Sequence, residues 1–139
     1  MSKIIYAKDD GTVVVIHPVD SSLSTSDIAS KAVPDGTSYE VIDDNKIPSD
    51  RTFRGAWVKG SGVVTEDVTK AKVIAHKIRR EKRELEFEPH DNIISLNIPG
   101  QDATAAETSR AAIRTKYATM QTNIDNATNI AGIKTALGG

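Results

Sequence analysis

The spacing of apolar residues changes near Thr65 and divides this chain of 139 residues into two parts. Before this point the apolar residues form short β-branched runs separated by Gly, Pro, Asp and Ser, which is typical of strands and turns. After it they recur at every third or fourth position, as in amphipathic helices. The sequence therefore predicts an α+β protein, in which a small N-terminal ββαβ unit precedes a long C-terminal helical hairpin and a short terminal helix.

The expected ββαβ unit begins with residues 3–17, where two β-branched runs flank Asp10 and the glycine after it. This pattern predicts a β-hairpin, because glycine tolerates the positive φ of a tight turn. The second run, at 13–16, does not alternate with polar residues, so we expect both of its faces to be covered. A short helix over 25–32 and a strand over 37–44 complete the unit.

The domain plan has three parts: a docking unit over 1–58, a linker over 59–64 and a helical region over 65–139. The linker, KGSGVV, contains two glycines and is expected to be flexible. Thr65 is a plausible N-cap for a long amphipathic helix. The apolar stripe of this helix consists of Val68, Ala71, Ala75, Ile78 and Leu85. Pro89 either kinks or ends the helix, because proline lacks the N–H that helical bonding needs.

A second helix is predicted from about Asp102 to Asn126, with a seven-residue repeat that resembles a coiled-coil seam. One column of the seam contains Ala106, Ile113, Met120 and Ala127, and the other contains Arg110, Tyr117 and Ile124. A third, short helix is expected after a cap at Thr128, with Ile130, Ile133 and Leu137 on one face.

The composition limits the size of the hydrophobic core and the kinds of partner that the chain's charge favours. Hydrophobic residues make up 38% of the chain and aromatic residues 4%, so the core is either thin but self-sufficient or completed by other chains. The second alternative predicts a homo-oligomer formed through the helices. The net charge of −1 gives no overall case for nucleic acid or an anionic membrane as a partner. No apolar stretch approaches the roughly 18 residues of a membrane span.

The reactive side chains do not form a recognisable catalytic or metal-binding pattern. The three histidines, His17, His76 and His90, fall in three different predicted elements, and no pair has the spacing of helical metal ligands. The chain contains no cysteine, and no serine lies in a Gly-x-Ser-x-Gly turn. We therefore expect no metal, no cofactor and no enzymatic activity.

A basic run lies on the first long helix. Between Lys70 and Arg83 there are seven basic residues and one acidic residue, and three glutamates follow at once. One interpretation is a solvated helix face with local ion pairs, each worth about 0.2–0.5 kcal/mol. The alternative is a docking face for an acidic protein, and Arg79, Arg80 and Arg83 are its candidate contact residues. Nucleic acid is a less favoured partner, because aromatic residues do not alternate with the bases.

The stretch IPSDRTFRGAWV, residues 47–58, gathers Arg51, Phe53, Arg54 and Trp57 at the joint between the two parts. A short helical turn after Ser49 would place Phe53 and Trp57 on one side. One interpretation is that the two rings pack the ββαβ unit onto the helices, as a satellite core under the linker. A compatible one makes the four residues an anchor for a protein partner, since Trp and Arg dominate interface hot spots.

The order of three segments, KIIYAKDDGTVVVIHP, IPSDRTFRGAWV and DVTKAKVIAHKIRREKR, resembles that in small proteins encoded among the tail and tail-fibre genes of tailed bacteriophages. The resemblance covers residues 1–98. Its specific part is DRTFRGAW at 50–57, followed by Lys70 and Ala71 in a basic helix. The C-terminal helices match only in character.

This resemblance implies a structural protein of the phage particle, made in the host cytoplasm and contacting other tail or fibre proteins. It carries over no catalytic residue. Two alternatives remain open: a tail-fibre assembly chaperone that is absent from the finished particle, and a host-takeover protein that binds a host enzyme or nucleic acid.

Overall fold

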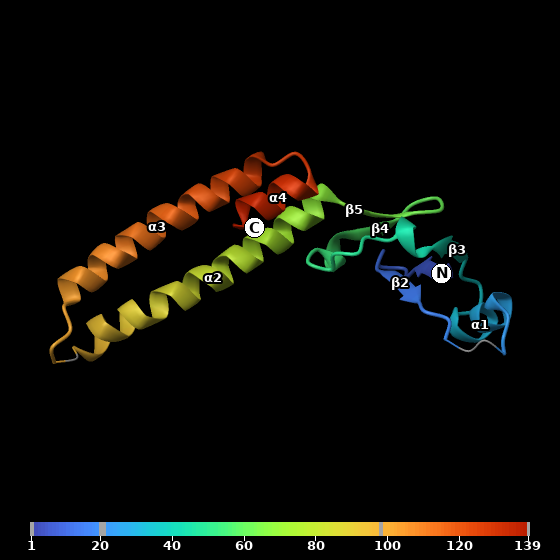
Figure 1. Cartoon of the computed structure of the whole chain (residues 1–139), viewed down its shortest axis with the longest axis horizontal. Coiled ribbons are helices and arrows are strands. Elements are labelled where there is room, and N and C mark those ends of the chain that lie inside the picture. The colour runs from blue at the N-terminus through green and yellow to red at the C-terminus, as the bar shows by residue number, and fades with distance from the viewer. Residues whose placement is uncertain (1, 20–21, 98, 139) are drawn as a thin grey trace. The chain divides into compact units, whose positions relative to one another are not determined.

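A computed structural model describes residues 2–19, 22–97 and 99–138, and it confirms the predicted α+β class. The chain divides into two compact units, Met1–Lys70 and Ala71–Gly139. The first contains five strands and one short helix, and the second contains most of a long helix and two further helices (Figure 1). The division therefore lies after residue 70 instead of within 59–64, where a linker was expected.

The N-terminal sheet has three antiparallel strands, β1 (Ser2–Ala7), β2 (Val13–Ile16) and β3 (Glu40–Asp43), in the order β2-β1-β3. The turn between β1 and β2 is wider than the sequence predicts, because Ala7 pairs with Val13 and five residues connect them. Thr12 donates its N–H to the Asp10 carboxylate, and Gly11 has a φ of 87°, so both expected turn residues still shape the loop.

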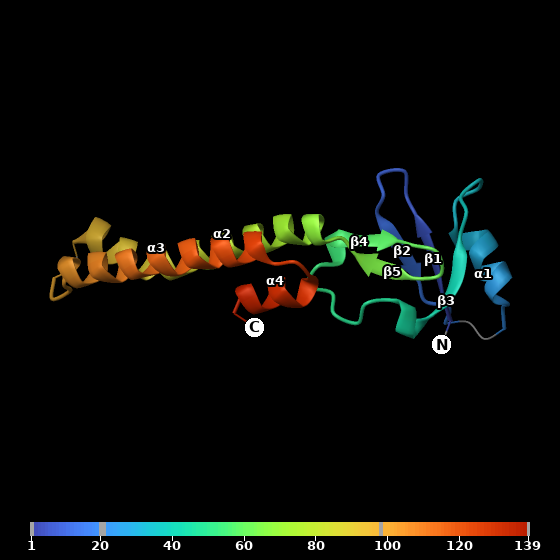
Figure 2. The same ribbon diagram turned by 90° about the horizontal axis from the view of Figure 1, so that it is seen from above.

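Helix α1 (Thr25–Ala32) occupies the predicted residues. Ser24 caps it through a reciprocal pair of bonds: the Ser24 hydroxyl accepts the Asp27 N–H, and the Asp27 carboxylate accepts the Ser24 N–H. Figure 2 shows α1 along one side of the sheet. On that side Ile4 and Tyr6 of β1 pack with Ala29 of α1.

The opposite face of the sheet has its own buried cluster. Ile5, Val13 and Ile42 pack there with Trp57 and Val64, which come from the next two strands. Successive residues of β1 and β2 thus enter different clusters, as the alternation of side chains along a strand requires. The prediction that the VVVI strand is covered on both faces is confirmed.

Strands β4 (Trp57–Lys59) and β5 (Val64–Glu66) form a second antiparallel sheet, in which Trp57 pairs with Glu66. The flexible linker predicted at 59–64 is wrong, because its ends are strand residues and 60–63 is the turn between them. The turn is closed by the Gly60 N–H, which bonds to the Val63 carbonyl at 2.8 Å. Two short 3₁₀ helices, Asp44–Lys46 and Arg54–Ala56, precede this hairpin.

Helix α2 (Val68–Leu96) is longer than expected and begins later. Thr65 is not its cap, because Thr65 is paired within β5. The N-cap position belongs to Asp67, whose carboxylate accepts the Lys70 N–H at 2.8 Å. Pro89 lies inside the helix and does not end it.

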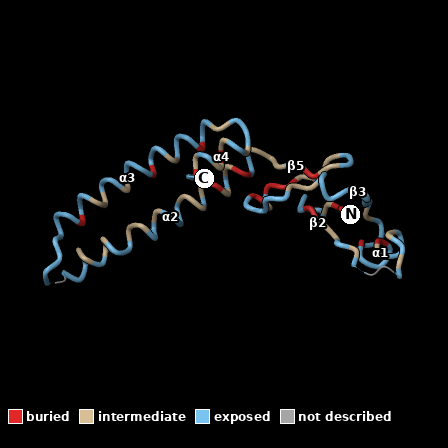
Figure 3. The backbone as a smooth tube through the Cα atoms, in the orientation of Figure 1, coloured by how far each residue is buried: buried red, intermediate tan, exposed pale blue. Residues whose placement is uncertain are grey.

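Helices α3 (Ala103–Asn126) and α4 (Ile130–Ala136) complete the second unit, and α2 and α3 run side by side in Figure 1. Helix α3 covers nearly the predicted residues, with Asp102 as its N-cap, and Asn129 caps α4 in place of Thr128. The buried positions appear at intervals along α3 in Figure 3. The predicted seam supplies Ala106, Tyr117 and Ile124, and α4 adds Ile133.

The predicted stripe of α2 is correct only near its N-terminal end. Ala71 and Ala75 are fully buried, but the Leu85 side chain is 68% exposed. A stripe with a period of 3.6 residues drifts around a helix, so its far end does not face the same neighbour.

Candidate functional site

The two rings of the joint are core residues. Trp57 is 3% exposed and packs with Ile5, Val13, Ile42 and Val64, and Phe53 has no exposed surface. Both rings are therefore buried, as the core interpretation predicts, but Trp57 belongs to the cluster of the N-terminal sheet and not to a satellite core under a linker. A partner docking on the folded chain meets neither ring, so Phe53 and Trp57 are not contact anchors in this conformation.

Arg54 lies over the Trp57 indole, with its guanidinium carbon 4.7 Å from the ring centroid. Its two terminal nitrogens lie 3.3 and 3.4 Å from the Val13 carbonyl oxygen, and both donate to it. Arg51 is more distant, at 6.0 Å from the same ring, and its side chain is exposed. Arg54 thus fixes the joint to β2, whereas Arg51 remains available at the surface.

The local turn of the joint differs slightly from the expected one. Asp50 accepts hydrogen bonds from both the N–H and the hydroxyl of Thr52. The 3₁₀ helix then begins at Arg54 instead of Asp50. The Asp67 N–H bonds to the Ala56 carbonyl, so the joint and the start of α2 are connected directly.

Two lysines of the basic run bond to backbone carbonyls at helix C-termini. Lys72 donates to the carbonyl of Asp125 in the last turn of α3, at 2.8 Å. Lys82 donates to the carbonyl of Leu137, the C-cap residue of α4, at 3.2 Å. Cations stabilise the negative end of a helix dipole and satisfy carbonyls that lack an intrahelical donor. Two of the seven basic residues of the run therefore have an intramolecular role.

The three candidate arginines of α2 have different environments. Arg79 donates to the His76 ring nitrogen Nδ1 at 3.3 Å, and burial together with the charges of Arg80 and Arg83 lowers the Arg79 pKa. Arg83 lies over the Phe87 ring at 4.9 Å. Arg80 is exposed. Two of the three predicted contact arginines thus have neighbours within the helix, and Arg80 is the one that is exposed to solvent.

The histidines do not assemble a metal site. His76 contacts the Asp125 carboxylate through Nε2 at 2.8 Å, and its other ring nitrogen accepts from Arg79. Within residues 2–19, 22–97 and 99–138, no group of three or more His, Asp or Glu side chains could hold a metal ion.

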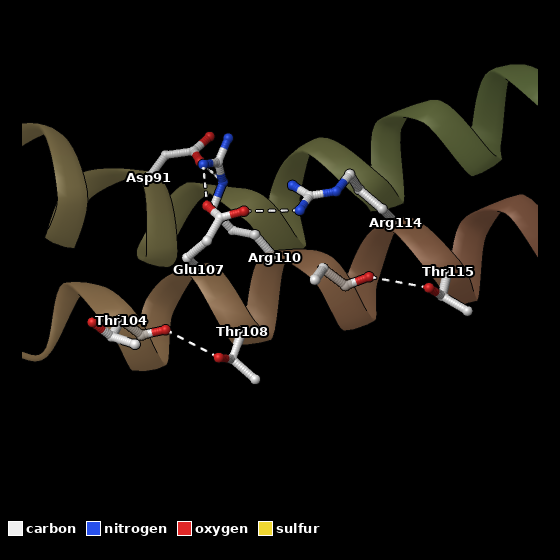
Figure 4. Close-up of polar contacts among 8 residues, drawn as sticks. Asp91, Thr104, Glu107, Thr108, Arg110, Arg114 and Thr115 are labelled. Atoms are coloured by element: carbon white, nitrogen blue, oxygen red, sulfur yellow. Dashed lines mark hydrogen bonds and ion pairs between the residues drawn. The ribbon is translucent and has the colours of Figure 1, made fainter.

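The α2–α3 hairpin carries a network of ion pairs on its surface. Arg110 contacts Asp91 of α2 and Glu107 of α3, both at 2.8 Å, and Arg114 contacts the other Glu107 oxygen (Figure 4). Hydrogen bonding from Arg114 and Arg110 lowers the Glu107 pKa. A carboxylate with a lowered pKa stabilises the fold above its unfolded pKa, and this contribution is lost as the pH falls through the folded value.

A hollow of about 390 Å³ lies between α2 and α3, with Pro89, Ala112 and Ile113 on its apolar side. On its polar side Lys116 contacts Glu86 at 2.6 Å, which lowers the pKa of Glu86 and raises that of Lys116. Both groups are therefore charged at neutral pH. Their pairing leaves an apolar groove with a neutralised rim.

One face of α3 is exposed and uncharged over five turns. Its positions between Thr104 and Thr122 hold only alanine and threonine, and all of them are exposed: Thr104, Ala105, Thr108, Ala111, Ala112, Thr115, Ala118, Thr119 and Thr122. Thr108, Thr115 and Thr122 recur every seven residues, and each hydroxyl bonds to the carbonyl four residues earlier. This inward bonding leaves the face smooth and free of charge. Sequence analysis could have found it from the same heptad that defined the seam.

Comparisons with known proteins identify no relative: no family model matches the chain, and neither a curated protein nor a solved structure does. Each helix in the described part of the chain is too short or too polar to cross a bilayer.

Proposed function

We propose that this chain is a non-enzymatic structural protein of a tailed-bacteriophage particle, an adaptor in the tail or fibre region that acts through protein contacts. The DRTFRGAW joint and the order of segments around it support the phage assignment. The surface of the second unit supports the contact role.

The observation that carries the contact role is the uncharged face of α3. Exposed helix faces normally carry charged residues, but this face is alanine and threonine from Thr104 to Thr122. Small residues allow helix backbones to approach closely, and a seven-residue spacing matches a second helix of the same period. A second copy of this chain has such a helix, so self-association through α3 is the expected use.

Sedimentation of the purified chain tests this role. The wild-type chain should sediment as a dimer or larger species, and the double variant Ala111→Glu, Ala118→Glu should be monomeric with unchanged helical ellipticity. Glutamate keeps the helix propensity high but places charge on the packing face. Gln121→Glu, beside the face, is the matched control and should keep the wild-type state. A wild-type monomer would refute the shared interface.

The particle assignment requires a separate measurement. Mass spectrometry of purified phage particles should find the chain in a fixed ratio to the tail proteins. Presence in infected cells but not in particles would favour the assembly chaperone instead. Retention on DNA cellulose that weakens steeply with salt would favour a host-directed nucleic-acid binder.

A further inference from the structure

The outer edge of β3 is the free edge of the N-terminal sheet. In the antiparallel pair of β1 and β2, the Lys8 N–H bonds to the Thr12 carbonyl. Backbone groups alternate between the two sides of a strand, so the Val13 carbonyl points away from β1. Arg54 bonds to that carbonyl, which agrees with the assignment. The edge of β2 is thus partly closed by an arginine.

The same alternation fixes the direction of the backbone groups of β3. Because Ile4 and Tyr6 direct their groups toward β2, Ile5 directs its groups toward β3 and bonds to Glu40, its partner there. Val41, one residue on, then points its N–H and carbonyl outward. No further strand follows β3 in the sheet order of the described residues. The outer side of β3 therefore presents backbone donors and acceptors in the register of a strand.

The side chains at this edge are apolar and exposed. Val41 is 48% exposed, and Tyr39, the residue just before the strand begins, is 40% exposed. A free edge with exposed apolar side chains can pair with a strand of another chain, and proteins usually protect such edges with charged residues, prolines or bulges. On β3, an acid stands at each end of the strand, Glu40 and Asp43.

The charges at this edge decide which partner fits. Residues 35–44 contain four acids and no basic residue, and one of these acids, Asp44, is paired with Lys3 of β1 at 3.4 Å. Glu40 is already neutralised by Lys59 at 3.1 Å, and its carboxylate also accepts the Gly62 N–H. Asp43 is exposed and has no ion pair among the described residues. Pairing two copies of β3 in the register that places Asp43 opposite Asp43 would bring two unpaired carboxylates together, and like charges opposite one another are destabilising.

We propose that the outer edge of β3 binds an extended segment of a partner protein as an added strand, with apolar residues against Tyr39 and Val41 and a basic residue against Asp43. Main-chain bonds would supply affinity in this mode, and the alternate side chains would supply specificity. The inference rests on the proposed adaptor function, for which it names the docking surface of the N-terminal unit.

Two capped peptides of about seven residues test the proposal against the full chain. Both carry Val at the two positions that face Tyr39 and Val41, and the position two residues further along, which faces Asp43, is Lys in one peptide and Glu in the other. Amide chemical shifts of the isotope-labelled protein report where each peptide binds. The Lys peptide should shift the amides of 39–43 and bind at least about tenfold more tightly than the Glu peptide, which is about 1.4 kcal/mol.

Val41→Pro removes the outward N–H without breaking a bond to β1, and proline is tolerated at such edge positions. It should weaken binding of the Lys peptide by about tenfold or more. Val41→Thr, which keeps the N–H and the branched side chain, is the matched control and should retain most of the binding. Asp43→Lys, whose substitution lies outside the buried clusters, should reverse the preference between the peptides.

Equal binding of both peptides to the wild type, or an unchanged preference in Asp43→Lys, would overturn the inference. So would self-association that Val41→Pro abolishes, because the occupant would then be a second copy. These results are separate from those on the proposed function. If the chain is found in phage particles but neither peptide binds the β3 edge, only the docking proposal is refuted. If the chain is absent from the particles, the structural role is refuted.

Discussion

At the scale of single residues, the joint shows how a scarce side chain is used. The only tryptophan lies 3% exposed beneath Arg54, and its indole Nε1 has no hydrogen-bond partner among the described residues. An unpaired buried donor costs free energy, so the stability that this ring contributes comes from its packing area. The residue types were visible in the sequence, but two interpretations remained open because burial depends on distant strands.

Trp57→Ala should lower the free energy of unfolding by about 3–5 kcal/mol, because it leaves a cavity among residues of four other strands. Urea unfolding monitored by ellipticity checks this value. Trp57→Phe should cost less, because it keeps an aromatic ring and removes the unpaired donor.

Arg51→Ala is the control for the exposed side of the joint, and its effect should stay within about 1 kcal/mol. An Ala variant at Trp57 that unfolds like the wild type would show that the ring does not support the core.

At the scale of elements, the largest difference from expectation is the β4–β5 hairpin. The sequence WVKGSGVVTE has β-branched residues on both sides of a Gly-rich turn, which is also a hairpin signal. Glycine content favoured a linker, but Trp57 and Val64 are buried against the first sheet and hold the two strands in place. Short strands of this kind depend on tertiary packing more than on local preference.

At Pro89 of helix α2, tertiary contacts also outweigh the local preference of the sequence. The sequence left open whether this proline kinks or ends the helix, and the helix continues for seven more residues to Leu96. Without an N–H, Pro89 cannot donate to the Leu85 carbonyl, and its ring crowds the preceding turn. The contacts of Glu86 and Asp91 with α3 lie on both sides of it and hold the two halves of the helix in register.

Pro89→Ala should therefore raise the free energy of unfolding of the helical unit, by up to about 3 kcal/mol, because it restores one backbone bond and relieves the crowding. Thermal unfolding followed by ellipticity measures the gain. His90→Ala, at the next position, is a control that leaves the backbone bonding unchanged. A lower stability of Pro89→Ala would mean that the packing around the hollow between α2 and α3 requires the proline ring.

At the scale of the whole molecule, the chain consists of two compact units whose division falls at residue 70. The single tryptophan belongs to the first unit, and most helical residues belong to the second. Tryptophan fluorescence therefore reports on the first unit, and far-ultraviolet ellipticity reports mainly on the second. This arrangement makes the cooperativity between the units measurable without labels.

Unfolding in urea should give different midpoints by tryptophan fluorescence and by far-ultraviolet ellipticity, because units with separate cores need not unfold together. Pro89→Ala should shift the ellipticity transition and leave the fluorescence transition unchanged. If the fluorescence and ellipticity curves of the wild type superimpose, and both shift by the same amount in Pro89→Ala, the two units unfold as one cooperative unit.

Sequence patterns alone predict the fold class, the residues of α1, the position and seam of α3 and the burial of β2 on both faces, because local propensity and periodicity govern these features. Tertiary structure decided the burial of Phe53 and Trp57, the hairpin in place of a linker and the use of Lys72 and Lys82 at helix ends. Each of these depends on which distant backbone or side chain lies nearby, and a pattern along one segment carries no information about that neighbour.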